Sequence, residues 1–102
     1  MGSWQRIIEL EAIPQQGSRV LKTGKGDIAL FRTADDQVFA LHDKCPHKGG
    51  PLSQGIVFEH TVVCPLHSWK IKLENGEAVA PDVGCAGKLV TKLEAGVVFL
   101  QI

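Results

Sequence analysis

Two short stretches, each with one cysteine and one histidine, constrain this chain more than any other feature of its sequence. Cys45-Pro46-His47 forms the first, Cys64-Pro65-Leu66-His67 forms the second, and residues 48–63 separate them. Each stretch offers one thiolate and one imidazole, which suits a 2Fe-2S cluster whose two irons have different ligands, because neutral histidines remove negative charge from one iron and raise the potential. The pattern predicts a fold that holds two loops side by side around such a cluster.

The same four side chains could instead hold a structural zinc ion, because two cysteines and two histidines also form a tetrahedral zinc set. Zinc modules usually pair Cys with Cys and His with His, whereas each stretch here mixes the two types. The mixed pairs favour the iron–sulfur interpretation. A zinc-bound structural or interaction module is the alternative, and it would be redox-inert and colourless.

In these four residues the chain resembles the Rieske proteins, whose signature is Cys-x-His, a gap of similar length, and Cys-x-x-His. The resemblance implies a Rieske-type 2Fe-2S cluster with Cys45 and Cys64 on the inner iron and His47 and His67 on the outer, more exposed iron. It also implies an all-β, Rieske-like antiparallel barrel or sandwich with a small inserted cluster-binding subdomain. We expect one domain over residues 1–102, with the cluster-binding subdomain at 44–80 and a base formed by 1–43 and 81–102.

Residues beside the ligands are expected to support the cluster. Glycines can bring backbone amides close to the sulfurs, and a proline after each ligand cysteine stiffens its loop. A serine after the second histidine could donate a hydrogen bond, although a solvated loop serine is the simpler interpretation. The expected surrounding set is Lys48, Gly49, Gly50, Leu66, Ser68, Trp69 and Pro81, of which Pro81 lies where the family has a third loop over the cluster. The remaining cysteine, Cys85, is expected to be a small buried hydrophobe.

Departures from the high-potential members of the family predict a low reduction potential. Those members carry an extra cysteine in each cluster loop and join the two in a disulfide, whereas this chain has Gly50 and Leu66 there. They also place a serine and a tyrosine after the second histidine, where this chain has Trp69 and Ile71, and it contains no tyrosine. Fewer hydroxyl donors stabilise the reduced cluster less, so we expect a potential near the low end of the range of about −150 to +300 mV.

Charge and hydropathy limit the classes of partner that the sequence suggests. Eleven basic and eleven acidic side chains cancel, so nothing indicates nucleic acid or an anionic membrane surface. No apolar run approaches the roughly 18 residues of a membrane span. The first ten residues include Trp4, Gln5, Arg6 and Glu9, where a secretory signal needs an apolar stretch. We therefore expect a cytoplasmic protein with no membrane partner.

Short apolar or alternating runs between turn-forming residues predict nine or ten strands. The expected strands cover residues 4–10, 19–23, 27–33, 37–42, 55–58, 61–64, 69–73, 77–80, 88–94 and 97–102. Asn75-Gly76 predicts a type I′ turn between two of them.

The flanking residues extend the resemblance to a narrower group. Residues 43–55, residues 64–69 and the segment Pro81-Asp82-Val83-Gly84-Cys85 resemble the small subunit of assimilatory NAD(P)H nitrite reductase. This resemblance implies an electron-transfer subunit, not catalytic alone, that accompanies a large subunit with FAD, a 4Fe-4S cluster and sirohaem in the reduction of nitrite to ammonia. The alternative is the Rieske ferredoxin of a ring-hydroxylating dioxygenase, which would carry electrons from a flavin reductase to an oxygenase.

Overall fold

The computed structural model describes residues 4–24, 26–45, 50–65, 68–80 and 83–101. Within these ranges ten strands form three antiparallel sheets, with strand orders β1-β10-β9, β2-β3-β4-β8 and β5-β6-β7. Two single-turn 3₁₀ helices, η1 (Leu10–Ala12) and η2 (Leu52–Gln54), lie between strands. Neither of these short turns is long or apolar enough to cross a bilayer. The predicted all-β, antiparallel architecture is confirmed.

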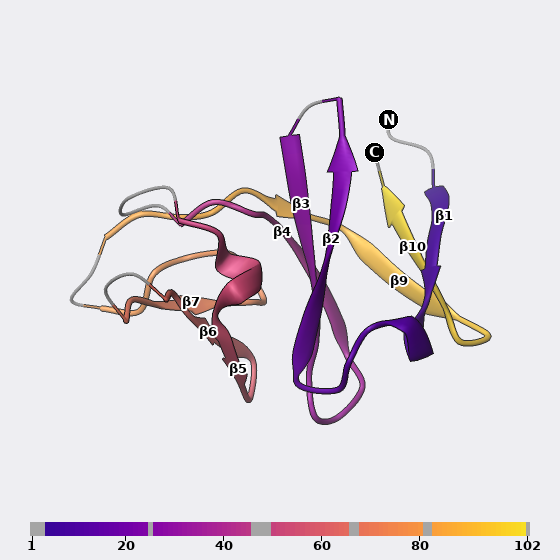
Figure 1. Cartoon of the computed structure of the whole chain (residues 1–102), viewed down its shortest axis with the longest axis horizontal. Helices are drawn as coiled ribbons and strands as arrows, with labels where there is room; N and C mark the ends of the chain where they lie inside the picture. The colour runs from indigo at the N-terminus through magenta and orange to yellow at the C-terminus, as the bar shows by residue number, and fades with distance from the viewer. Residues whose placement is uncertain (1–3, 25, 46–49, 66–67, 81–82, 102) are drawn as a thin grey trace.

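The strand bounds follow the predicted runs closely for most of the chain. They are β1 (Trp4–Glu9), β2 (Gly17–Thr23), β3 (Gly26–Arg32), β4 (Val38–His42), β5 (Ile56–Phe58), β6 (Thr61–Val63), β7 (Lys70–Lys72), β8 (Lys88–Leu89), β9 (Thr91–Glu94) and β10 (Val97–Gln101). Figure 1 shows β5, β6 and β7 on one side of β2 and β3, and β1, β9 and β10 on the other side.

The central strand β3 contributes to two separate hydrophobic cores. Ile28 and Leu30 pack into one core with residues of β10, while Ala29 and Phe31 pack into the other with residues of the third sheet. All four side chains are at most 3% exposed. A strand buried on both faces needs apolar residues at every position instead of at alternate ones, which explains the uninterrupted run Ile28-Ala29-Leu30-Phe31.

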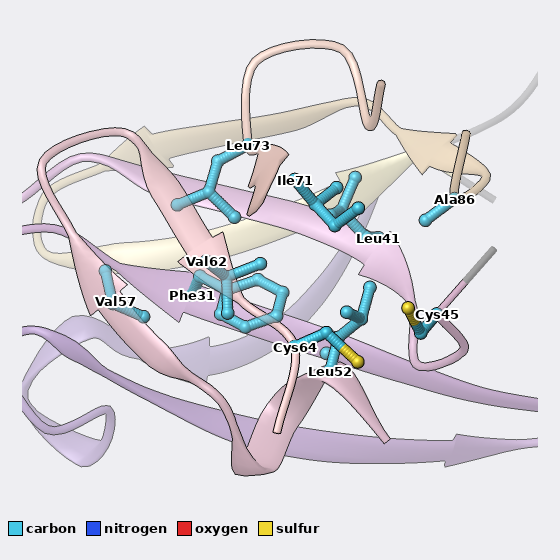
Figure 2. Close-up of a cluster of buried hydrophobic side chains, with 11 residues drawn as sticks. Phe31, Leu41, Cys45, Leu52, Val57, Val62, Cys64, Ile71, Leu73 and Ala86 are labelled. Atoms are coloured by element: carbon cyan, nitrogen blue, oxygen red, sulfur yellow. The ribbon is translucent and has the colours of Figure 1, made fainter. Parts of the chain in front are cut away.

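The second of these cores lies between β3, β4 and the third sheet. Val57, Val62 and Ile71 are register partners on β5, β6 and β7, and all three point inward and are buried. Figure 2 shows them facing Phe31 and Leu41. The full buried set is Ala29, Phe31, Leu41, Cys45, Leu52, Val57, Val62, Cys64, Ile71, Leu73 and Ala86. Both cysteines of the predicted site belong to it.

Two of the predicted strands differ in the structure. Residues 88–94 form β8 and β9 instead of one strand, because the chain changes partner at Val90: β8 pairs with β4, whereas β9 pairs with β10. Residues 77–80 form only two isolated bridges, Ile71 with Ala78 and Glu77 with Cys85.

The predicted type I′ turn at Asn75-Gly76 is wrong. That turn requires a positive φ at both central residues, and here Gly76 has φ of 77° while Asn75 is not among the residues with positive φ. Instead, the Asn75 side-chain Oδ1 accepts a hydrogen bond from the Glu77 N–H at 2.9 Å. This local side-chain bond offers the backbone an alternative to the two-residue turn.

Candidate metal centre

The two cysteines predicted as ligands lie together at one end of the second core. Cys64 directly follows β6, and Cys45 follows β4 by three residues. Both residues are buried, each 2% exposed. Figure 2 shows the two sulfur atoms at the same end of the buried cluster, close to Leu52. The fold therefore brings together two soft ligands that are separated by 18 residues of sequence.

Each cysteine is held by the same backbone hydrogen bond. The Cys45 N–H donates to the Gly50 carbonyl at 2.8 Å, and the Cys64 N–H donates to the Trp69 carbonyl at 2.7 Å. In both loops the acceptor is five residues after the cysteine, so each bond closes a loop over the segment that carries the predicted histidine. In the second loop, the Ser68 N–H also donates to the Cys64 carbonyl at 3.0 Å. These bonds hold the cysteine backbones in place.

A carboxylate at the start of the first loop ties that loop to the rest of the fold. Asp43 accepts two hydrogen bonds from Ser53, one from its N–H and one from its hydroxyl, both at 2.7 Å. The Ser53 carbonyl in turn accepts a bond from the Ser18 hydroxyl on β2 at 2.6 Å. Our sequence analysis missed Asp43 and Ser53 as supports for the site. Their contact spans ten residues, and only an aspartate two positions before the ligand cysteine hints at it.

The structure describes only some of the remaining predicted site residues. Gly50 is buried, Trp69 is half-buried and packs against the second core, and Ser68 is exposed with φ of 57°. His47, Lys48, Gly49, Leu66, His67 and Pro81 lie outside the described residues. Within the part of the chain that the structure describes, no group of three or more His, Cys, Asp or Glu side chains gathers elsewhere to hold a metal.

The prediction that Cys85 is buried is wrong. Cys85 is exposed and pairs with Glu77 through an isolated bridge. The next residue, Ala86, is 4% exposed and belongs to the same buried cluster as the two predicted ligand cysteines. Because side chains alternate between faces along an extended segment, only one of the two neighbours can enter the core, and the smaller one does.

A second polar cluster joins the third sheet to the middle sheet. His60, in the turn between β5 and β6, has its Nε2 3.2 Å from Asp35 Oδ2, and Asp35 lies in the turn between β3 and β4. On its other side, His60 Nδ1 lies 4.0 Å from Glu74 Oε1. The Thr33 hydroxyl donates to Asp35. The hydrogen bond from Thr33, followed by the one from His60, lowers the pKa of Asp35 below its ordinary value of 3.8.

We predict a pH-dependent contribution of Asp35 to stability. A carboxyl group whose pKa is lowered by folding stabilises the native state above its unfolded pKa, and this stability is lost as the pH falls through the folded pKa. Asp35→Asn should therefore lower the melting temperature at neutral pH, and the difference from wild type should vanish at acid pH below the lowered pKa. Thermal melts from neutral to acid pH measure this, and Thr33→Val should raise the pKa of Asp35 in an NMR titration. A melting-temperature difference that is independent of pH would contradict the prediction.

The sequence matches one protein-family model over most of its length. The model is that of the Rieske [2Fe-2S] domain, and it matches residues 3–92. This chain therefore belongs to the Rieske family, and its cofactor is a 2Fe-2S cluster of the Rieske type. The predicted family, fold and cofactor are confirmed, and the zinc alternative is set aside.

Relatives in this family have diverse functions. The chain is 42% identical over 71 residues to the 4beta-methylsterol monooxygenase of Methylococcus capsulatus. The matched region covers 68% of this chain but only 19% of that protein. It is 32% identical to the anthranilate 1,2-dioxygenase ferredoxin subunit of Burkholderia cepacia, over 74% of this chain and 69% of that protein. It is also 40% identical to the nitrite reductase [NAD(P)H] large subunit of Klebsiella oxytoca, over 72% of this chain and 8% of that protein.

Solved structures share the whole fold at low sequence identity. A candidate NADH-dependent nitrite reductase small subunit from Mycobacterium tuberculosis superposes with a TM-score of 0.87 and 18% identity, covering 100% of this chain and 96% of the other. The ferredoxin of carbazole 1,9a-dioxygenase from Nocardioides aromaticivorans gives a TM-score of 0.85 and 17% identity, with 97% of each chain covered. Both comparisons confirm the Rieske fold and do not separate the two functions.

The residues that the structure describes fit a Rieske cluster. Two cysteines from different loops, both buried at the end of an apolar core, offer the soft sulfur ligands that one iron requires. The apolar side chains beside them, Leu52 and Ala86, limit access of water, and outer residues of this kind tune the potential of a metal centre.

Proposed function

We propose that this chain is the electron-transfer subunit of an assimilatory NAD(P)H nitrite reductase. The observation that carries the proposal is the 40% identity with the nitrite reductase large subunit of Klebsiella oxytoca over 78 residues. The full-length structural similarity to a candidate nitrite reductase small subunit supports it. Such a subunit works with a reductase that uses NAD(P)H, and we expect it in the cytoplasm with the large FAD and sirohaem subunit as its partner.

Within this function the chain would bind the cluster through four side chains. We propose Cys45 and Cys64 as ligands of one iron and His47 and His67 as ligands of the other, with residues 44–80 as the cluster-binding part. When bound, the cluster accepts and donates one electron at a time. The described residues of the chain contribute in two ways. The backbone bonds that close the loops hold the cysteines in place, and Leu52 and Ala86 keep their surroundings apolar.

The proposal is tested by reconstitution. The anaerobically purified holoprotein is added to a purified large sirohaem flavoprotein subunit of a nitrite reductase, and NAD(P)H-dependent ammonia formation from nitrite is measured. The rate should rise on addition of the wild-type chain and should stay at its basal value with the Cys64→Ala variant, which controls for the cluster. Equal rates with both proteins would overturn the proposal.

One observation favours a second candidate, the ferredoxin of a ring-hydroxylating dioxygenase. The ferredoxin subunit of anthranilate 1,2-dioxygenase is 32% identical, and the match covers 69% of that protein, so the two chains are similar in length as well as in sequence.

A second assay separates the nitrite reductase subunit from the dioxygenase ferredoxin. The reduced holoprotein is mixed with a terminal oxygenase, and its reoxidation is followed by absorbance. Reoxidation there, together with no effect on nitrite reduction, would favour the ferredoxin.

We predict a reduction potential near the low end of the range of about −150 to +300 mV for Rieske centres. Ile71 is fully buried in the core and Trp69 is half-buried, and neither side chain carries a hydroxyl group that could donate to the cluster. The reduced, more negative state therefore loses stabilisation. A reductive titration, followed by absorbance and by the rhombic, low-average-g electron paramagnetic resonance signal, measures the midpoint. A midpoint well above 0 mV would contradict the prediction.

A further inference from the structure

The outer face of the third sheet carries two rows of side chains that the core does not use. Val57, Val62 and Ile71 point inward, so their neighbours along each strand point outward. The register pairs Ile56 with Val63 and Val63 with Lys70, and it pairs Phe58 with Thr61 and Thr61 with Lys72. We refer to this surface as the distal face, formed by Ile56, Phe58, Thr61, Val63, Lys70 and Lys72.

The distal face carries the two most exposed large apolar side chains on the described strands. Ile56 is 72% exposed and Phe58 is 62% exposed, whereas the exposed large apolar side chains on the strands of the other two sheets, Trp4, Val20 and Leu93, are at most 43% exposed; Val83, at 85%, lies in a loop. Both residues lie on β5, which is the edge strand of its sheet. Natural edge strands are protected by short length, charged residues or proline; β5 is short, with 3 residues, but has no charged residue or proline. Two adjoining exposed apolar side chains on such an edge indicate an interaction surface.

The charge on the distal face is basic next to this apolar strip. Lys70 and Lys72 are exposed, and neither forms an ion pair with another described residue. Lys72 has an acidic neighbour, because its N–H donates to the Glu77 carbonyl at 2.8 Å. Lys70 has Val63 on one side and Val79 on the other, with the Val79 N–H donating to the Lys70 carbonyl at 2.8 Å. Among the described residues, Lys70 is therefore the lysine of the face with no acidic register neighbour and no ion pair, and it fits a carboxylate on a partner.

The distal face adjoins the second cysteine loop. Val63 directly precedes Cys64, and Lys70 directly follows Trp69, whose carbonyl accepts the Cys64 N–H at 2.7 Å. A protein bound to this face would therefore lie beside the loop that carries one of the proposed ligands. Short distance favours electron transfer, so the position of the face suits a redox partner.

We propose that the distal face docks an acidic one-electron redox protein, with an apolar centre against Ile56 and Phe58 and a carboxylate against Lys70. One electron then passes from the reduced partner to the oxidised cluster, and no bond forms or breaks. The proposal depends on electron transfer by the Rieske cluster, which both candidate functions share, and not on nitrite reduction.

The test uses a flavodoxin, an acidic flavoprotein, as the probe. Stopped-flow absorbance records the second-order rate at which reduced flavodoxin reduces the oxidised holoprotein at low salt. The distal variants are Lys70→Glu and the double variant Ile56→Ser with Phe58→Ser. The controls are Lys88→Glu on β8 and the double variant Val90→Ser with Leu93→Ser, which alter an exposed lysine and two exposed apolar side chains, 49% and 42% exposed, outside the distal face. Because electrostatic steering changes association rates by about 10- to 1,000-fold, we expect Lys70→Glu to slow reduction at least about tenfold and Lys88→Glu less than about twofold.

Three outcomes would overturn the proposal. The first is an unchanged rate in both distal variants, and the second is an equal loss in the controls, which would show that only overall charge matters. The third is a dimer of the wild-type holoprotein in sedimentation velocity that the Ile56 and Phe58 double variant dissociates, because a second copy would then occupy the face. Unchanged cluster absorbance and melting temperature verify that each variant is folded. If the double variant of Ile56 and Phe58 does not fold, the single variant Phe58→Gln replaces it. Since no nitrite is present, failure of this assay is distinct from failure of the proposed function.

Discussion

Cys64→Ala is expected to eliminate the Rieske cluster and to lower the stability of the whole chain. Cys64 is buried in the second core together with Cys45, Leu52 and Ala86. The free energy of metal binding also stabilises the fold, because the ligands come together only in the native state. For a domain of this size each kcal/mol of lost stability lowers the melting temperature by about 4–8 °C, so the variant should melt clearly below the holoprotein. Cys45→Ala should behave in the same way.

The chain offers a matched control in its third cysteine. Cys85 is exposed and lies outside the buried set that contains the other two. Cys85→Ala should keep its iron content, its electron paramagnetic resonance signal and its melting temperature. Iron analysis and the spectrum of anaerobically purified protein measure the first two quantities. A Rieske signal in Cys64→Ala, or its loss in Cys85→Ala, would refute the ligand assignment.

Gly76→Ala is expected to destabilise the chain by about 2–5 kcal/mol, as the sum of two effects. The first is a positive φ of 77° at Gly76, which costs a residue with a Cβ about 1–2 kcal/mol. The second is a collision, because a Cβ at this position would lie 2.1 Å from the Ala86 carbonyl oxygen. Relieving such a clash in a packed region costs about 1–3 kcal/mol.

The site of this collision matters for the cluster. The Gly76 carbonyl accepts the Ala86 N–H at 2.7 Å, so the two segments are in direct backbone contact beside the core that holds the cysteines. Displacing Ala86 should therefore also lower the iron content of the purified protein. Urea denaturation monitored by circular dichroism measures the stability, and iron analysis measures the cluster.

Gly96→Ala separates the two effects. Gly96 has φ of 75°, almost the same as Gly76, but a Cβ there would meet no atom within 4 Å. This control should lose only the conformational part, about 1–2 kcal/mol, and should keep its full iron content. Equal losses of stability in the two variants would show that the close approach to Ala86 has no energetic consequence.

Local sequence predicted the parts of the site that depend on a few adjacent residues. Cys45 and Cys64 were identified from short motifs, and the structure places them together because each motif follows a strand of the predicted pattern. The pair Asp43 and Ser53 was missed because their contact joins two ends of a loop. Cys85 was expected to be buried on residue type alone, whereas its exposure depends on which side of an irregular segment faces the core.

The strands were predicted well where an apolar or alternating run is clear, β3 with both faces buried included, and less well where pairing is irregular. The break at Val90 depends on a change of partner from β4 to β10, and the turn at Asn75 depends on one side-chain hydrogen bond. Composition and periodicity encode neither. The order of strands within each sheet, such as β1 beside β10, depends on contacts between the two ends of the chain.

Strand β3 has a different hydrophobic core on each of its two faces. Its register with the neighbouring strands therefore fixes the packing on both sides of the protein. A slip by one residue would exchange Ile28 and Leu30 with Ala29 and Phe31, so it would disrupt the contacts with β10 and those around the cysteines at the same time. By contrast, a change of side chains in one outer sheet affects the packing on only one face of β3. The sheet at the cluster end can therefore change its surface for different partners while the packing on the opposite face of β3 is kept.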